Sequence, residues 1–276
     1  MDNLNKVLQK HGFYFKKAYG QNFLTDTTLL DDIVEKSMVG SGDVVLEIGC
    51  GAGALTRALA KKVKKVVGYE IDQKLKPVLE ETLGEFNNVE IVFGDILKQN
   101  LEMVEKKLGE KYVMVANLPY YITTPIVMEF LEKAKNIKAM VIMVQEEVAN
   151  RFSATKGTAD YGAITVAINL RGKASIIKKV GREKFTPMPN VDSAVVKIDI
   201  EEGKTDGVDL VAVRNAVRCG FSNRRKMLVN NLMNTYKISR AQAEKALIDS
   251  GISLTARGET LDYLEYIKLS NKLKES

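Results

Sequence analysis

The sequence is poor in histidine and cysteine. It contains one histidine, His11, and two cysteines, Cys50 and Cys219, among 276 residues. A single histidine excludes a histidine-based metal cluster and a histidine-dependent catalytic triad. The cysteines are far apart and have no metal-ligand spacing, so we expect reduced thiols, no disulfide and no bound metal, as in cytosolic proteins.

Long apolar segments are also missing. No run approaches the ~20 apolar residues that a membrane-spanning helix requires, and no signal-peptide-like segment opens the chain. We therefore expect a cytoplasmic protein without a membrane partner. We also expect it to be monomeric. A chain of 276 residues that is 45% hydrophobic can bury a substantial core, which argues against disorder and suits one large domain with a smaller one.

Positive charge is moderate in total but unevenly distributed. The net charge of +6 and a pI near 9.0 permit a nucleic-acid partner without requiring one. Three segments carry basic residues and no acid, namely residues 3–25, 173–182 and 214–226. A charge cluster is often only a solvated face, but three such segments are equally compatible with a polyanion-binding surface.

Short apolar runs alternate with amphipathic stretches between Asp43 and Gln145. The pattern predicts buried strands at 44–48, 66–70, 89–93, 112–116 and 139–144, with helices at 54–62, 73–83 and 125–133. Alternation of this kind is typical of a parallel, doubly wound α/β sheet.

The pattern changes after Gln145. Segments 176–184 and 193–200 are predicted to form an antiparallel strand pair at the sheet edge, joined by a proline-rich turn. The polar segment 201–209 has the composition of a linker. Helical patterns follow at 210–234, 239–250 and 261–272. We therefore predict an N-terminal arm and α/β domain in residues 1–200 and a small helical domain in residues 201–276.

Glycines and acids follow the first three predicted strands. Gly49 and Gly51 allow close approach of a ligand to the backbone, and the helix start beyond them favours an anionic group. Glu70 ends the next strand about 20 residues on, where an acid commonly binds ribose hydroxyls. The glycines also fit a dinucleotide fingerprint, so NAD remains an alternative here. Asp95, before Ile96, could accept a bond from an adenine amino group or simply cap a helix.

The fourth strand ends in Asn117-Leu118-Pro119-Tyr120. Amino groups on aromatic bases are poor nucleophiles because the ring delocalises their lone pair. The Asn117 amide oxygen and the Leu118 carbonyl could accept both N–H bonds and localise that pair. Pro119 would stiffen the turn, and Tyr120 would offer a stacking face. Such a tetrapeptide alone is more often a plain strand end, but four strands that deliver functional groups to one sheet edge favour a ligand site.

In order and spacing, these motifs resemble the S-adenosylmethionine-dependent rRNA adenine dimethyltransferases. The resemblance covers nearly the whole chain, through segments 17–24, 49–53, 69–72, 94–95, 117–120, 185–193 and 221–226. It is nearest to the branch that dimethylates the N6 amino groups of two adjacent adenosines near the 3′ end of 16S rRNA. It implies a Rossmann-like class I methyltransferase sheet with a helical, rRNA-binding C-terminal domain, acting on 16S rRNA within the immature small ribosomal subunit.

The resemblance also implies roles for individual residues. S-adenosyl-L-methionine, with S-adenosyl-L-homocysteine as its product, would be bound by Gln21, Asn22, Leu24, Gly49, Gly51, Glu70, Ile71, Asp95, Ile96 and Asn117. The target base would be held by Asn117, Leu118, Pro119, Tyr120 and Phe185. Judged from its sequence neighbours alone, Phe185, which precedes two prolines, would more often pack at an edge strand. RNA would be bound by Lys16, Lys17, Arg182, Arg218, Arg224, Arg225 and Lys226.

Three other functions compete with this hypothesis. Large-subunit rRNA methyltransferases that confer antibiotic resistance share the cofactor and base motifs, although the full-length helical tail favours the small-subunit branch. An RNA-binding assembly factor could keep the fold while methylation is dispensable, although the intact Asn117 motif argues against lost activity. An NAD-dependent dehydrogenase would need a base and a substrate arginine pattern that the sequence lacks.

Overall fold

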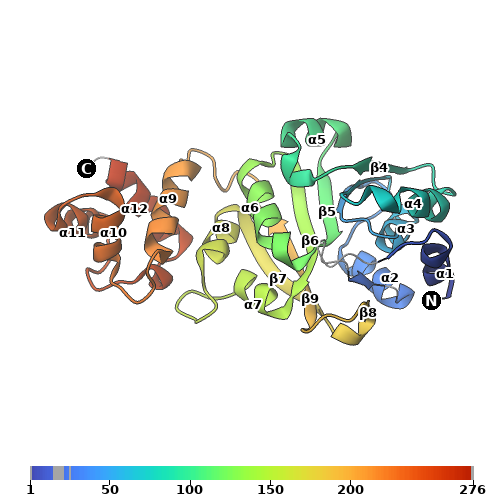
Figure 1. Cartoon of the computed structure of the whole chain (residues 1–276). Helices are drawn as coiled ribbons and strands as arrows, with labels where there is room; N and C mark the ends of the chain where they lie inside the picture. The colour runs from blue at the N-terminus through green and yellow to red at the C-terminus, as the bar shows by residue number, and fades with distance from the viewer. Residues whose placement is uncertain (1, 15–21, 25, 275–276) are drawn as a thin grey trace. The chain divides into compact units, whose positions relative to one another are not determined.

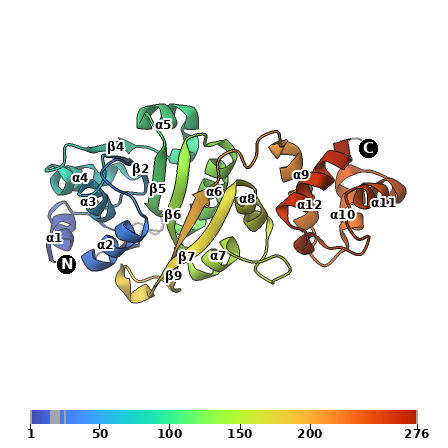
Figure 2. The same ribbon diagram turned by 180° about the vertical axis from the view of Figure 1, so that it is seen from behind.

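The computed structural model describes residues 2–14, 22–24 and 26–274. These residues form two compact units, shown in Figures 1 and 2. The first contains residues up to 149 together with 175–200, and the second contains residues 150–174 and those from 201 onward. Within the described residues, no helix combines the length and the apolar character needed to cross a membrane.

A seven-stranded sheet organises the first unit, with the strand order β4-β3-β2-β5-β6-β9-β7. Its first five strands in this order are parallel: β4 (Val89–Phe93), β3 (Lys65–Glu70), β2 (Val44–Ile48), β5 (Tyr112–Asn117) and β6 (Ile137–Gln145). β9 (Ser193–Ile200) pairs antiparallel with β6, and β7 (Gly172–Val180) forms the edge. The predicted parallel α/β sheet is confirmed by these pairings. The central strands β2 and β5 are nearly continuous apolar runs buried on both faces, as in other parallel sheets, whereas the residues of β4 are half-buried.

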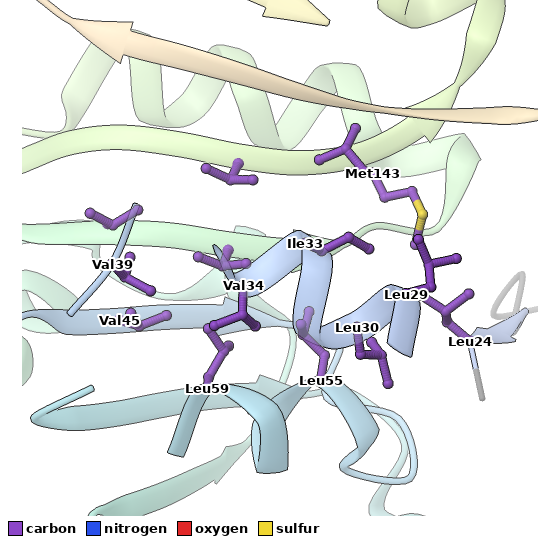
Figure 3. Packing of buried hydrophobic residues seen from close by; sticks show 14 of the residues in the cluster. Leu24, Leu29, Leu30, Ile33, Val34, Val39, Val45, Leu55, Leu59 and Met143 are labelled. Carbon is purple, nitrogen blue, oxygen red and sulfur yellow. The ribbon is translucent and has the colours of Figure 1, made fainter. Parts of the chain in front are cut away.

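Helices surround the sheet, and all but the first lie between strands in the sequence. They are α1 (Asp2–Lys10), α2 (Thr27–Lys36), α3 (Ala54–Ala60), α4 (Lys76–Leu83), α5 (Leu101–Leu108) and α6 (Thr123–Lys133), with short 3₁₀ turns η2 (Gln73–Leu75), η3 (Ile96–Lys98) and η4 (Tyr120–Ile122). Figure 3 shows α2 and α3 packed on one face through Val34 and Leu59 against Val45. Because strand side chains alternate in direction, Val44 and Leu46 face the other side.

A two-stranded ribbon brings the chain near its N-terminus beside the proline-rich turn. β1 (Phe23–Leu24) pairs antiparallel with β8 (Phe185–Thr186), so that Leu24 lies opposite Phe185. The Lys184 Nζ lies 2.9 Å from an Asp26 carboxylate oxygen and adds a second link. The ribbon therefore holds Leu24 at the same end of the sheet as the Asn117 turn.

The second unit is helical. It contains α8 (Ala163–Arg171), α9 (Leu210–Phe221), α10 (Leu228–Tyr236), α11 (Arg240–Asp249), η6 (Gly258–Thr260) and α12 (Tyr263–Lys274), while α7 (Glu146–Phe152) runs into it from the first unit. Glycine is required where α9 meets η6, because a Cβ on Gly258 would overlap the Gly220 carbonyl. The Tyr266 hydroxyl donates to the Gly258 carbonyl at 2.9 Å and fixes this contact.

Two predicted elements differ from the structure. The strand predicted for 176–184 stops at Val180, because the Arg182 N–H donates to Asp192 Oδ1 and a turn, η5 (Arg182–Lys184), replaces the ladder. The helix predicted for 210–234 is two helices, α9 and α10. The Asn231 amide donates to the Gly220 and Asn223 carbonyls and thereby stabilises the break between them.

The domain boundary differs in one segment. The sequence placed residues 150–174 in the α/β domain, whereas in the structure they group with the helices. Val166 and Leu170 of α8 belong to the helical core, and the Tyr161 hydroxyl donates to the Leu261 carbonyl at 2.9 Å. These long-range contacts are invisible in the local pattern on which the boundary was based.

Candidate cofactor and base-binding site

A pocket opens at the carboxyl ends of the parallel strands. It is lined by twelve residues that the sequence singled out, namely Asn22, Leu24, Gly49, Gly51, Glu70, Ile71, Asp95, Ile96, Asn117, Leu118, Pro119 and Tyr120. Every predicted cofactor residue in the described part of the chain is among them. Gln21 lies outside the described residues. The pocket therefore unites motifs from four strands, as expected at this edge of an open α/β sheet.

The glycine turn after β2 is shaped by left-handed backbone angles and by Glu70. Gly49 and Gly51 have φ of 79° and 55°, a region that side chains other than glycine rarely adopt. The Gly51 N–H donates to Glu70 Oε2 at 2.9 Å, and the Asp72 N–H donates to Glu70 Oε1 at 2.8 Å. Burial raises the pKa of Glu70, which these two donors oppose. Glu70 thus stabilises the turn, and its carboxylate oxygens can still accept further hydrogen bonds from a ligand.

A second acid, Glu47, was missed by the sequence reading. It lines the pocket and is only 1% exposed, and its Oε2 has no hydrogen-bond partner among the described residues. Burial raises its pKa to about 8, opposed by the Thr56 hydroxyl and reinforced by the Glu70 carboxylate. The available signal was an acid inside the otherwise apolar run of β2. A buried carboxyl with an unused oxygen can accept a hydrogen bond from a ligand, and a positively charged ligand group beside it would favour its charged form.

Two roles were considered for Asp95, a helix cap and a contact with an adenine amino group. Its Oδ1 accepts from the Leu97 N–H at 3.0 Å and caps η3, so the capping reading is confirmed. The same residue lines the pocket beside Ile96. Ile71, 42% exposed at the pocket, offers an apolar surface. A contact of Asp95 with an adenine amino group stays a prediction.

The Asn117 turn is rigid and closely packed. The Asn117 amide Nδ2 donates to the Asn22 carbonyl at 3.2 Å, which orients the amide and leaves its oxygen as an acceptor. Leu118 is buried, and the Pro119 carbonyl accepts from the Ile122 N–H at 3.1 Å and the Thr123 hydroxyl at 3.2 Å. The turn is therefore held from both sides before any ligand binds.

Tyr120 is anchored at the far end of its ring. Its hydroxyl lies 2.8 Å from Ser193 Oγ on β9, and Ser193 is fully buried. Burial raises the pKa of Tyr120, so the phenol stays neutral at physiological pH. Sequence reasoning missed Ser193 because its contact with Tyr120 spans 73 residues. It also missed Phe23, which lines the pocket and stacks on Phe13 with ring centroids 6.0 Å apart.

Phe185 is buried in a hydrophobic cluster that includes several residues of the pocket lining. It is 4% exposed and belongs to the same hydrophobic cluster as Leu24 and Val195, and it is not among the residues that line the pocket. This is the edge-strand packing that its neighbours in sequence favoured. Its contact with a target base, implied by the resemblance, stays a prediction.

Comparison with known proteins identifies the family. Residues 12–275 match the family model described as ribosomal RNA adenine dimethylase. The chain belongs to this family. A ribosomal RNA small subunit methyltransferase A from Geobacillus thermodenitrificans is 43% identical over 97% of this chain and 94% of its own length. A protein of the same name from Bacillus licheniformis is 42% identical over 98% and 95%.

Solved structures agree with the fold of this rRNA adenine dimethylase. A dimethyladenosine transferase from Plasmodium falciparum has a TM-score of 0.77 and 27% identity, covering 90% of this chain and 95% of that one. The 23S rRNA methyltransferase ErmE has a TM-score of 0.68 and 29% identity, covering 92% and 100%. The dimethylase fold is thus found both in a protein named dimethyladenosine transferase and in a protein named for 23S rRNA.

The predicted RNA-binding residues of this dimethylase lie on its surface. Arg182, Arg218, Arg224, Arg225 and Lys226 are all exposed, whereas Lys16 and Lys17 lie outside the described residues. Two of the arginines bind backbone carbonyls, Arg182 that of Asn190 at 3.1 Å and Arg224 that of Ala159 at 3.0 Å. Contacts with RNA stay a prediction. Over the described ranges, no three His, Cys, Asp or Glu residues are grouped to hold a metal ion.

Proposed function

We propose that this dimethylase transfers methyl groups from S-adenosylmethionine to the N6 amino groups of two adjacent adenosines near the 3′ end of 16S rRNA, within the immature small ribosomal subunit. The observation that carries the proposal is the joining of the glycine turn and the Asn117 turn in one pocket. Relatives at 42–43% identity named small subunit methyltransferase A support the choice of rRNA.

The residues of the pocket fit this cofactor. When bound, S-adenosylmethionine supplies an electrophilic methyl group on a sulfonium sulfur. The unused oxygen of Glu47 would accept from its ammonium group, and Glu70 would accept from its ribose hydroxyls. Ile71 and Ile96 provide apolar surface for an adenine ring, and Asp95 an acceptor for the adenine amino group.

The Asn117 turn would activate the target amino group. The Asn117 amide oxygen and the Leu118 carbonyl accept its two N–H bonds, which localises the nitrogen lone pair toward the cofactor. Tyr120, held by Ser193, offers the face on which the base stacks. Positioning and fixed dipoles then supply most of the rate. No strong base is needed, because the nitrogen gives up its proton readily once alkylated.

Access to the amino group requires the adenine to leave its stack. The exposed basic residues Arg182, Arg218 and Arg225 would hold the rRNA backbone while this occurs. Such contacts release counterions, so binding should weaken as salt rises.

The test is labelled-methyl transfer to purified immature small subunits, mature small subunits and large subunits in parallel. Wild-type protein should methylate the immature small subunit at two adjacent adenosines. Asn117→Ala should lower the rate by about 100-fold or more, because one of the groups that hold the amino nitrogen is lost. Its fold should persist, since the side chain makes a single hydrogen bond to the Asn22 carbonyl in the described structure.

Asn87→Ala, at an exposed turn amide outside the pocket, is the matched control and should retain wild-type transfer. Normal dimethylation by Asn117→Ala would contradict the mechanism. Transfer to large subunits instead would contradict the choice of the small subunit, which the names of the relatives support.

A further inference from the structure

A second hollow lies on the same end of the sheet, where β6 ends and β9 begins. It is lined by Gln145, Glu146, Glu147, Arg182, Asn190, Val191 and Asp192. All seven belong to the first unit. We call it the β6–β9 hollow. The positions of the two strands can be followed in Figure 1. None of its residues except Arg182 has a part in the proposed function.

The β6–β9 hollow adjoins the stacking tyrosine. In the antiparallel β6–β9 register, Gln145 lies directly opposite Ser193. Ser193 is the residue whose hydroxyl holds Tyr120, at 2.8 Å. Asp192 comes immediately before Ser193, and its carbonyl accepts from the Glu146 N–H at 3.0 Å. The Tyr120–Ser193 bond therefore links a residue that lines the target pocket to the start of the strand that borders the hollow.

Most charged groups of the hollow already have partners. Glu146 Oε1 lies 2.6 Å from the Lys179 Nζ. Asp192 Oδ1 accepts from the Arg182 N–H at 3.0 Å, and the Arg182 guanidinium donates to the Asn190 carbonyl at 3.1 Å. In contrast, the side-chain amides of Gln145 and Asn190 make no hydrogen bond to any described residue. These two amides are the groups that the hollow offers to a ligand.

The chemistry of these groups matches adenine. Asparagine and glutamine amides pair with adenine through one donor and one acceptor, usually at N6 and N7. Val191, 44% exposed, gives the apolar contact that a base face needs, and Arg182 can stack on a base or meet a phosphate. Three carboxylates make the hollow unsuitable for a phosphate alone, so the base edge is the better partner.

We infer that the β6–β9 hollow binds the adenine next to the target adenine, while the target is in the pocket. The inference rests on the proposed function, whose substrate presents two adjacent adenosines. Gln145 and Asn190 hold the neighbouring adenine in the hollow, while Tyr120 holds the flipped target adenine in the pocket. The target nucleotide is therefore fixed both directly and through its neighbour. The hollow thereby selects for a pair of adenosines and not for a single one.

The test uses small subunits in which one of the two adjacent adenosines is replaced by purine riboside, which lacks the amino group. The initial rate of methyl transfer to the remaining adenosine is measured for wild-type protein and for Gln145→Leu/Asn190→Ala. Wild-type protein should react about tenfold more slowly beside purine, since the hydrogen bond from the adenine amino group to an amide oxygen is lost. The double variant should be slow with both substrates and should not distinguish them.

Gln9→Ala, at an exposed amide of α1, is the matched control and should keep the tenfold preference. If the double variant fails to fold, Asn190→Ala alone, in an exposed loop, should still reduce the preference severalfold. Equal wild-type rates beside adenosine and purine, or an unchanged preference in the variants, would overturn the inference alone. No wild-type transfer to the natural pair would overturn the proposed function, and the inference with it.

Discussion

At the scale of single residues, the pocket depends on groups whose surroundings change their chemistry. Asn117 is an ordinary amide until the Asn22 carbonyl orients it. Glu47 is an acid that burial keeps largely protonated near neutral pH, since its pKa is raised to about 8. Both effects arise from contacts, so the same residues in an unfolded chain would have neither property.

Glu47 should make the stability of the protein depend on pH. Its pKa rises from 4.5 to about 8 on folding, so between these values the folded protein holds a proton that the unfolded chain has lost. The free energy of unfolding should therefore fall as pH rises through this window, by roughly 3–5 kcal/mol, and level off above it. Urea unfolding of wild type and Glu47→Gln at pH 5 to pH 8.5 measures the slope.

Glu47→Gln should have a smaller pH slope across the same window, because glutamine does not titrate. Glu80→Gln, at an exposed acid of α4, should keep the wild-type slope. Identical slopes in wild type and Glu47→Gln would show that Glu47 does not bind a proton on folding.

At the scale of elements, strand ends and short turns decide what reaches the pocket. The parallel strands β2, β3, β4 and β5 end at one edge, which is why motifs 20 or more residues apart in sequence meet there. The β1–β8 ribbon adds Leu24 from the N-terminal side. The same ribbon places Phe185 in the hydrophobic cluster, several members of which also line the pocket.

Variants of Phe185 can distinguish a role in packing from a role in base binding. Phe185→Leu keeps a large apolar side chain in the cluster but removes the aromatic face. From its burial we expect a loss of about 1 kcal/mol in unfolding free energy and nearly wild-type methyl transfer. Phe185→Ala should cost about 3–5 kcal/mol, because it leaves a cavity. Thermal unfolding and methyl transfer are measured together; lost transfer in Phe185→Leu at nearly unchanged stability would support the stacking role.

At the scale of the whole molecule, the chain forms two units with separate cores. The first contains the pocket and the β6–β9 hollow. The second is helical and exposes Arg218, Arg225 and Lys226, for which no ion pair is present among the described residues. Unpaired surface cations are free to meet phosphate, so we expect the second unit to contribute affinity for rRNA and the first to contribute chemistry.

Removing two of these charges should therefore weaken RNA binding without altering the reaction. Arg225→Ala/Lys226→Ala should lower affinity for small subunits and reduce the slope of log affinity against log salt by about 1–2. The rate at saturating substrate should stay close to wild type. Filter binding from low to moderate salt measures the slope. Lys62→Ala, at an exposed residue following α3, should leave it unchanged, and an unchanged slope in the double variant would argue against phosphate contacts there.

Much of the α/β unit was predictable because its signals are local. Apolar runs placed β2, β4 and β9 with the bounds observed, and glycine and acid residues at strand ends marked the pocket. The break between α9 and α10 was not predictable in the same way, since Asn231 stabilises it through carbonyls 8 and 11 residues distant. The grouping of residues 150–174 with the helices depends on still longer contacts.

The sequence by itself determined which chemical groups stand at the ends of the parallel strands. Strand direction follows from the alternation of elements, and parallel strands must deliver their carboxyl ends to one edge. Only the tertiary structure decided how those groups are set: Ser193 holding Tyr120, Glu47 buried with an unused oxygen, and Phe185 buried in a hydrophobic cluster. Each of these depends on burial and on contacts between distant segments, and neither exists until the chain has folded.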